Sequence, residues 1–491
     1  MKTNFSSRTI ISLLLLITLT AVSFGVAQKV DRSKPPELGP PPSLTLPPIQ
    51  HFTLSNGLQV TLMEKHQLPL VQMELQVMGG SAMDPADMPG LASMTASMME
   101  EGAGTRNSLE FADAIDYLGA NISVFAGQHT STVSLHTALS KLDSALALFA
   151  DVAQRPMFPA AELERLRKER LTTLIQWHDE PRSIASVQFN RTLFGTQHPY
   201  GIPTIGTEKS ISSMSVNDLN SFHKKYFGSN NARLIVVGDV SKKQILQKLE
   251  DAFGKWKSAQ KSDKKWPEIE QVKEKRIYLV DKPGAAQSEI RIGRIGVQRL
   301  TEDYFPLLVM NTILGGSFSS RLNQNLREEH GYTYGAGSSF DFRPLPGPFS
   351  ARAAVQTNVT DKALAEFMKE LTNILTPVSD DEMVRAKNYL ALGYPDNFQS
   401  VAQVAAQLAD LSVYNLPDSY FNSYIQKILA VTKEDVNRVA RKYIDPETMA
   451  IIVVGDRSQI EQGISTLNIA PISNFSVDDV LGKAPVLDEA K

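Results

Sequence analysis

Residues 215–239 read SVNDLNSFHKKYFGSNNARLIVVGD, and residues 432–456 read TKEDVNRVARKYIDPETMAIIVVGD. The two stretches align without a gap at an offset of 217 residues (456 against 239), and both close on IVVGD. Each stretch predicts an acid-capped helix, then a turn and a buried strand. A match of this length indicates an internal duplication, so we expect two similar halves of roughly 200 residues each.

The segments around the repeat predict how each half is built. Strand-like runs alternate with long amphipathic helices, and Asn56-Gly57 between two alternating runs predicts a hairpin. We therefore expect an α+β fold in which each half packs helices on a mostly antiparallel sheet, with a linker joining the halves into a clamshell. The expected bounds are 50–257 for the N-terminal half, 258–275 for a solvated lysine-rich linker, 276–470 for the C-terminal half and 471–491 for a tail.

The N-terminus has the pattern of an export signal. Lys2 and Arg8 flank an apolar run over residues 10–26, and small residues place a cleavage point after Ala27. An uncleaved membrane anchor is the alternative, because the run is about long enough to span a bilayer. Residues 28–49 are proline-rich and predict an extended leader. We expect a signal peptide over 1–27 and export, to a bacterial periplasm.

Composition excludes several kinds of site. The chain has no cysteine, so it has no disulfide, thiolate metal site or cysteine nucleophile. A net charge of −3 gives no electrostatic sign of nucleic-acid binding. No two of the eight histidines are four residues apart, so no helix presents a zinc-binding pair. There is also no phosphate-binding glycine loop and no GxSxG motif.

Several segments together resemble the pitrilysin/insulinase family of inverted-motif zinc peptidases, which includes the mitochondrial processing peptidase. They are FTLSNGLQV, PGLASMTASMMEEGAGT, the ERL helix and GGSFSSRLNQNLREEHGYTY, set in a chain of two halves. The resemblance covers about residues 50–465. It implies the two-half fold of that family and a connection with peptide hydrolysis.

The resemblance also implies that the zinc site has degenerated. Active members carry H-x-x-E-H after such a Gly-Leu-Ala, where the histidines bind zinc and the glutamate is the general base. The matching positions here are Ser93, Ala96 and Ser97, and Gln176 takes the place of the distal glutamate ligand, while Glu169 is kept. These residues cannot replace the metal ligands and base, so we expect no zinc in this chain. A Ser93–Ser97 hydroxyl nucleophile is the alternative, but no base accompanies it in the sequence.

The C-terminal half resembles the family's second functional element, in which an arginine and a tyrosine contact the substrate backbone. The matching residues are Arg327 and Tyr334, with Tyr332 as an alternative. Both are donors suited to a peptide carbonyl. The alternative is a helix-end ion pair of Arg327 with Glu328 and a core position for Tyr334. Gly315 and Gly316 suggest a flexible loop lining the cavity, or a helix stop.

The resemblance therefore implies a non-catalytic, substrate-binding subunit of an exported zinc metalloendopeptidase. Such a chain would be inactive alone and would pair with a homologue that carries the zinc motif, and a homodimer is also possible. Peptides or unfolded segments would bind in extended form by strand addition to a sheet edge. The alternative is an inactive peptide-binding or scaffold protein of the same fold, and a self-sufficient hydrolase is the third possibility.

Overall fold

The computed structural model describes residues 39, 44–260 and 264–487. The predicted signal peptide over 1–27 and most of the predicted leader over 28–49 lie outside the described residues, so both stay predictions.

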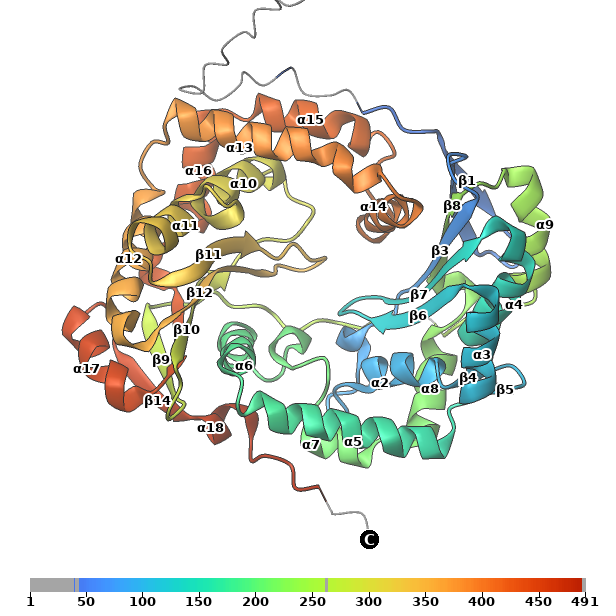
Figure 1. The fold of residues 1–491 in the computed structure, drawn as a ribbon, viewed down its shortest axis with the longest axis horizontal. Helices are drawn as coiled ribbons and strands as arrows, with labels where there is room; N and C mark the ends of the chain where they lie inside the picture. The colour runs from blue at the N-terminus through green and yellow to red at the C-terminus, as the bar shows by residue number, and fades with distance from the viewer. Residues whose placement is uncertain (1–38, 40–43, 261–263, 488–491) are drawn as a thin grey trace, which may run out of the picture. The chain divides into compact units, whose positions relative to one another are not determined.

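Two six-stranded sheets organise the part of the chain that the structure describes, and most of their strand pairs are antiparallel (Figure 1). The N-terminal sheet has the spatial order β1 (Ile49–Thr53), β2 (Gln59–Glu64), β8 (Ala232–Gly238), β3 (Leu70–Val77), β7 (Ser131–Ala138) and β6 (Asn121–Ala126). The C-terminal sheet has the order β14 (Ile472–Ser476), β9 (Arg276–Asp281), β13 (Ala450–Gly455), β10 (Gln287–Ile295), β12 (Pro348–Gln356) and β11 (Thr333–Phe340). A short ribbon pairs β4 (Gly102–Ala103) with β5 (Arg106–Asn107).

The duplication is visible element by element. Adding 217 to the bounds of β2 gives those of β9, and adding it to α8 (Val216–Tyr226) gives α16 (Lys433–Tyr443). Five strands follow the same order in both sheets, and only β1 and β14 at the outer edges differ. The predicted fold class, two homologous halves of helices on mostly antiparallel sheets, is confirmed.

The helices follow the same duplication. The other N-terminal helices are α2 (Leu91–Met99), α3 (Ser108–Leu118), α4 (Leu142–Gln154), α5 (Ala160–Trp177), α6 (Pro181–Phe194), α7 (Glu208–Ser213) and α9 (Lys242–Phe253). The C-terminal half has α10 (Tyr304–Asn311), the π-helical turns η5 (Thr312–Gly316) and η6 (Gln324–Glu329), α11 (Arg321–Asn323), α12 (Thr360–Asn373), α13 (Asp380–Gly393), α14 (Val401–Tyr414), α15 (Tyr420–Ala430), α17 (Arg457–Leu467) and α18 (Val477–Leu481).

The two halves exchange a helix. α6 packs on β13 and β10 of the C-terminal sheet, whereas α14 packs on β8 and β3 of the N-terminal sheet (Figure 1). Phe189 of α6 is buried with Ile452, and Leu408 of α14 is buried with Ile235 and Val237. Each sheet therefore depends on the other half for its apolar cover, so we infer that the halves fold as one unit.

Two expected boundaries differ from the structure. The residues expected to form a tail continue the fold, because β14 pairs in parallel with β9 and α18 packs on α6. The C-terminal half thus extends to Leu481. The expected solvated linker is partly held by the N-terminal half: Ala259 is buried, and Lys264 donates to the backbone carbonyl of Asp84 at 3.0 Å.

A buried carboxylate anchors α16 and makes stability depend on pH. Asp303 accepts hydrogen bonds from Arg438 (2.6 Å), Lys442 (2.8 Å) and the Tyr443 hydroxyl (2.7 Å). Burial alone raises the pKa of Asp303, but the hydrogen bonds outweigh it and bring the pKa to about 2. Because this pKa lies below that of the unfolded chain, about 4, the stabilisation is complete above that pH and is lost as the pH falls towards 2.

We expect Asp303→Asn to lower the free energy of unfolding by about 2–4 kcal/mol at pH 7, because three donors lose a charged acceptor. Urea unfolding at pH 7 and at pH 2.5 measures the effect, and the deficit should shrink at the lower pH. Asp380→Asn is the matched control. Asp380 also pairs with a residue of α16, Lys433, at 2.6 Å, but its carboxylate is exposed. The control should change stability by less than about 1 kcal/mol. Equal effects of the two substitutions would contradict the assignment.

Candidate functional site

The helix with the degenerate zinc positions, α2, starts from a fixed turn. Gly90 precedes it with φ 90°, and a side chain there would meet the Ile205 carbonyl, so the position requires glycine. The Asp84 carboxylate accepts hydrogen bonds from the Gly90 (2.7 Å) and Ala92 (2.8 Å) amides. Burial raises the pKa of Asp84 to about 7, although these amides, Lys264 and Arg170 oppose the rise.

A half-buried arginine, Arg170, contacts both serines of α2. The Arg170 side chain of α5 donates to the Ser93 hydroxyl at 2.6 Å and to the Ser97 hydroxyl at 3.0 Å. Ser93 and Ser97 lie one turn apart, so they share a helix face. Burial lowers the pKa of Arg170 to about 10, and the Asp84 carboxylate opposes the change. The site thus holds a guanidinium, which keeps its positive charge at neutral pH.

These residues do not fit a zinc ion. Serine hydroxyls are not among the usual zinc ligands, and here both are engaged by Arg170. A guanidinium between the two helices also repels a divalent cation. Ala96 is buried and carries no proton-transfer group. Across residues 44–260 and 264–487, no group of three or more histidine, aspartate or glutamate side chains is arranged to hold a metal.

Arg170 is the residue that sequence reasoning missed. Gln176, the expected substitute for the distal ligand, is exposed, and its side chain forms no hydrogen bond with any described residue. Six residues correspond to about 240° around a helix, so Gln176 and Arg170 lie on different faces of α5. Glu169 instead pairs with Arg165 at 2.6 Å, and Arg165 reaches Glu101 just beyond α2. The sequence of α5 offers no signal that distinguishes Arg170 from the nearby Arg165 and Arg167.

The edge strand next to α2 is partly capped. The Val124 amide of β6 donates to the Glu100 carboxylate at 2.5 Å, so it is not free to pair with an added strand. Burial raises the pKa of Glu100, and this hydrogen bond opposes the change. Phe125, the next residue on β6, is 71% exposed. Strand addition at the centre of β6 would therefore require Glu100 to move.

In the C-terminal half, the expected substrate-contacting side chains reach the surface. Tyr334 of β11 is 91% exposed, whereas Tyr332 stacks on His330 with ring centroids 4.9 Å apart. Arg327 of η6 is half-buried, lies 4.5 Å from the centre of the Phe318 ring and is 3.4 Å from Glu328. The helix-end ion pair considered for Arg327 is thus present. Tyr334 does not pack in a core.

Close contacts in the fold explain why positions 315 and 316 are both occupied by glycine. A Cβ atom on Gly315 would lie 2.3 Å from the Ser338 amide of β11, so this turn needs glycine to approach the strand. A Cβ atom on Gly316 would lie 2.8 Å from the side-chain nitrogen of Asn311. Asparagine side chains also cap the edge of β11: the Ala336 amide donates to Asn323, and the Ser338 carbonyl accepts from Asn311. The turn that contains Gly315 and Gly316 therefore packs closely against β11.

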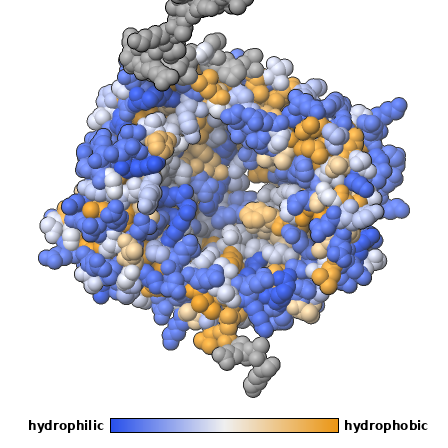
Figure 2. All heavy atoms as spheres, in the orientation of Figure 1, coloured by the Kyte–Doolittle hydropathy of each residue, from blue (hydrophilic) through white to orange (hydrophobic). Residues whose placement is uncertain are grey.

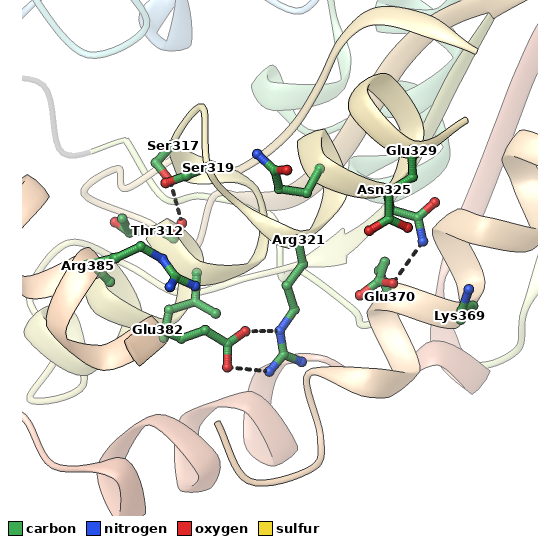
Figure 3. A pocket seen from close by; sticks show the side chains of 13 residues that line it. Thr312, Ser317, Ser319, Arg321, Asn325, Glu329, Lys369, Glu370, Glu382 and Arg385 are labelled. Atoms are coloured by element: carbon green, nitrogen blue, oxygen red, sulfur yellow. Dashed lines mark hydrogen bonds and ion pairs between the residues drawn. The ribbon is translucent and has the colours of Figure 1, made fainter. Parts of the chain in front are cut away.

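A polar pocket of about 230 Å³ lies between η5 and α13, at the C-terminal counterpart of the α2–α5 contact (Figure 3). Arg321 donates to both oxygens of Glu382 at 2.6 and 3.1 Å across it. At the offset of 217, Glu382 of α13 corresponds to Arg165 of α5, whereas Arg321 corresponds to Gly104, so the two halves hold this helix through different ion pairs. No histidine lines this pocket.

Fold and site together define a duplicated α+β protein in which an arginine and two serines meet at the contact between α2 and α5. Residues 59–208 match the model of the insulinase family, peptidase family M16, and residues 213–390 match that of the peptidase M16 inactive domain. Together these matches cover more than half of the chain, and the chain belongs to the M16 peptidase family.

Relatives of the chain are described either as zinc proteases or as non-peptidase homologues. It is 25% identical over 411 residues to an uncharacterized zinc protease of Mycobacterium leprae, covering 82% of this chain and 90% of the relative. It is 20% identical over 398 residues to the non-peptidase homolog YmxG of Helicobacter pylori, covering 81% and 91%. The family therefore includes relatives described as peptidases and as non-peptidases.

Solved structures share the fold. A peptidase M16 inactive domain from Pseudomonas fluorescens superimposes with a TM-score of 0.77 at 27% identity, covering 83% of this chain and 98% of that one. A protease from Helicobacter pylori gives a TM-score of 0.76 at 22% identity, covering 83% and 100%.

Among the helices that the structure describes, none combines the length and apolarity needed to cross a membrane.

Proposed function

We propose that this chain is an exported, non-catalytic M16 subunit that binds peptides or unfolded segments and pairs with a homologue bearing the zinc motif. The observation that carries the proposal is the pairing of Arg170 with Ser93 and Ser97, which gives the helix pair a cation in the place of metal ligands. In this proposal the homologue supplies the zinc and the general base.

The contribution of this chain to substrate binding would come from Arg327 and Tyr334. The Tyr334 phenol is exposed, and the Arg327 guanidinium is partly accessible beside Phe318. Both groups donate hydrogen bonds, so they suit the carbonyl oxygen of an extended peptide. The molecular surface is hollowed near the middle of the face in Figure 2, and hydrophilic side chains predominate over that face. A hydrophilic surface suits a polypeptide backbone that brings its own polar groups.

A scaffold protein is the second candidate, and the capped strand edges favour it. Glu100 occupies the Val124 amide of β6, and Asn323 occupies the Ala336 amide of β11. Both caps oppose the expected strand addition. Peptide binding through side chains alone remains compatible with them.

We expect the mature chain alone to contain less than about 0.1 zinc per molecule and to cleave no peptide, since it lacks three metal ligands. Mixed with the zinc-motif homologue from the same organism, it should form a complex that cleaves peptides. Arg327→Ala should lower that rate about tenfold or more. Peptide cleavage, zinc analysis and size-exclusion chromatography measure these outcomes.

Arg441→Ala is the matched control, because Arg441 is an exposed arginine of the same half at the end of α16. It should leave the rate unchanged. Zinc-dependent cleavage by this chain alone would disprove the non-catalytic assignment. Failure of the two chains to associate would favour the scaffold.

A further inference from the structure

Three arginines gather on the face of the C-terminal sheet that α6 covers. Residues alternate between faces along β10: Ile290 and Ile292 enter the core on the other face, whereas Arg291 lies 5.8 Å from the centre of the Phe189 ring of α6. Arg352 of β12 is directly opposite Arg291 in the strand register. The third arginine is Arg182, in the first turn of α6.

The positive charges of this arginine cluster, Arg182, Arg291 and Arg352, are only partly balanced. The nearby carboxylate is Glu289, whose oxygen is 3.7 Å from the Arg291 guanidinium. Burial raises the pKa of Glu289, and the charges of Arg291, Arg182 and Arg352 oppose that rise. Like charges directly opposite each other on neighbouring strands destabilise a sheet. The arrangement therefore has a cost that the fold must offset.

The cluster also has unused hydrogen-bonding capacity. Arg291 is only 8% exposed, and its Nε atom has no hydrogen-bond partner. Arg182 and Arg352 are exposed, and neither forms an ion pair with any residue in the described ranges. A buried donor without a partner is costly, whereas a bound acceptor would satisfy it.

The N-terminal half shows that the fold does not require these charges. At the offset of 217, Arg291 corresponds to Glu74 of β3, whose partner in the register is Ser134 rather than a charged residue. The same strand position in the same architecture thus carries an acid in one half and an arginine in the other. The arginine pair is a feature of the C-terminal half alone.

We propose that the arginine cluster binds a carboxylate of a bound peptide, from an acidic side chain or from the peptide C-terminus. Guanidinium groups form bidentate hydrogen bonds with carboxylates, and the excess positive charge favours an anion. Arg352 is opposite Gly337 of β11, the strand that carries Tyr334, so the cluster lies one strand away from the proposed backbone contact. The exposed amide side chains of Gln287 and Gln356 face each other in the same register and can pair with the peptide backbone. The inference rests on the proposed peptide-binding function and names the class of peptide.

Fluorescence anisotropy with three short unstructured peptides tests the proposal. One has central glutamates and an amidated C-terminus, the second has glutamines in their place, and the third is the glutamine peptide with a free C-terminal carboxylate. The full chain, alone and with its homologue, should bind at least one carboxylate peptide about tenfold more tightly than the neutral one. Whichever carboxylate peptide binds more tightly shows whether the site takes an acidic side chain or the peptide C-terminus.

The double variant Arg182→Gln/Arg352→Gln should abolish this preference while binding the neutral peptide as the wild type does. Both residues are exposed and their removal relieves like-charge repulsion, so the thermal unfolding midpoint should not fall. Lys243→Gln is the matched control: Lys243 is exposed on α9 and forms no ion pair with a described residue. It should retain the preference.

The other outcomes separate the two proposals. Equal binding of the three peptides would overturn the carboxylate site and leave peptide binding intact. A preference that survives in the double variant would also overturn it, since the selectivity would then come from elsewhere. Absence of binding by all three peptides would defeat the proposed function and the carboxylate site together.

Discussion

Restoring the two histidines alone should not restore zinc binding. We expect Ser93→His/Ser97→His to bind zinc weakly, and the added change Arg170→Glu to raise the affinity about 100-fold or more. The reason lies in the contacts of Arg170, which reaches both serines and leaves a positive charge where the metal would lie. Replacing it by glutamate removes the repulsion and supplies a third ligand from the same helix face.

The experiment compares four chains by zinc titration and by metal content after dialysis. Arg170→Glu alone is the first control and should bind no zinc. The second control is Ser93→His/Ser97→His/Gln176→Glu, which should also fail because Gln176 lies on another face of α5 and Arg170 is still present. Stoichiometric zinc in either histidine variant that retains Arg170 would contradict the assigned role of its guanidinium.

We expect Leu408→Ala to lower the free energy of unfolding by about 2–5 kcal/mol, because it opens a cavity beneath α14. Leu408 is 1% exposed and lies in one core with Ile235 and Val237 of the N-terminal sheet. A substitution in the C-terminal half should therefore reduce amide protection of β8 in the N-terminal half. Urea unfolding and hydrogen exchange measure both effects.

The matched control for this prediction is Val384→Ala, on α13 in the same half. Val384 is 57% exposed, so its truncation should cost less than about 0.5 kcal/mol. Wild-type unfolding should show a single transition, since each sheet shares its core with a helix from the other half. Two separate transitions, or unchanged protection of β8 in Leu408→Ala, would show that the halves are stable independently.

The sequence by itself determined the duplicated architecture. The match between 215–239 and 432–456 placed a helix and a strand in each half, and α8, α16, β8 and β13 lie where it predicts. It also predicted the turn at Asn56-Gly57 between β1 and β2, where Gly57 has φ 88°. These features follow from side-chain periodicity and turn chemistry, which act over a few residues and are therefore legible along the chain.

The sequence also showed which chemistry is missing, since Ser93, Ala96 and Ser97 cannot act as zinc ligands or base. It did not show what took the place of the ligands. Arg170 is 77 residues from Ser93, and nothing in the local pattern of α5 separates it from its neighbours Arg165 and Arg167.

Only the tertiary structure decided the contacts between distant segments. The exchange of α6 and α14, the cap of Glu100 on Val124 and the opposition of Arg291 and Arg352 each join residues far apart in the chain. Such contacts depend on the register of strands and on how helices pack against sheets, and a shift of one residue would turn an arginine to the other face. Local propensities set the elements, whereas the side chains that meet at a site are fixed only when those elements pack together.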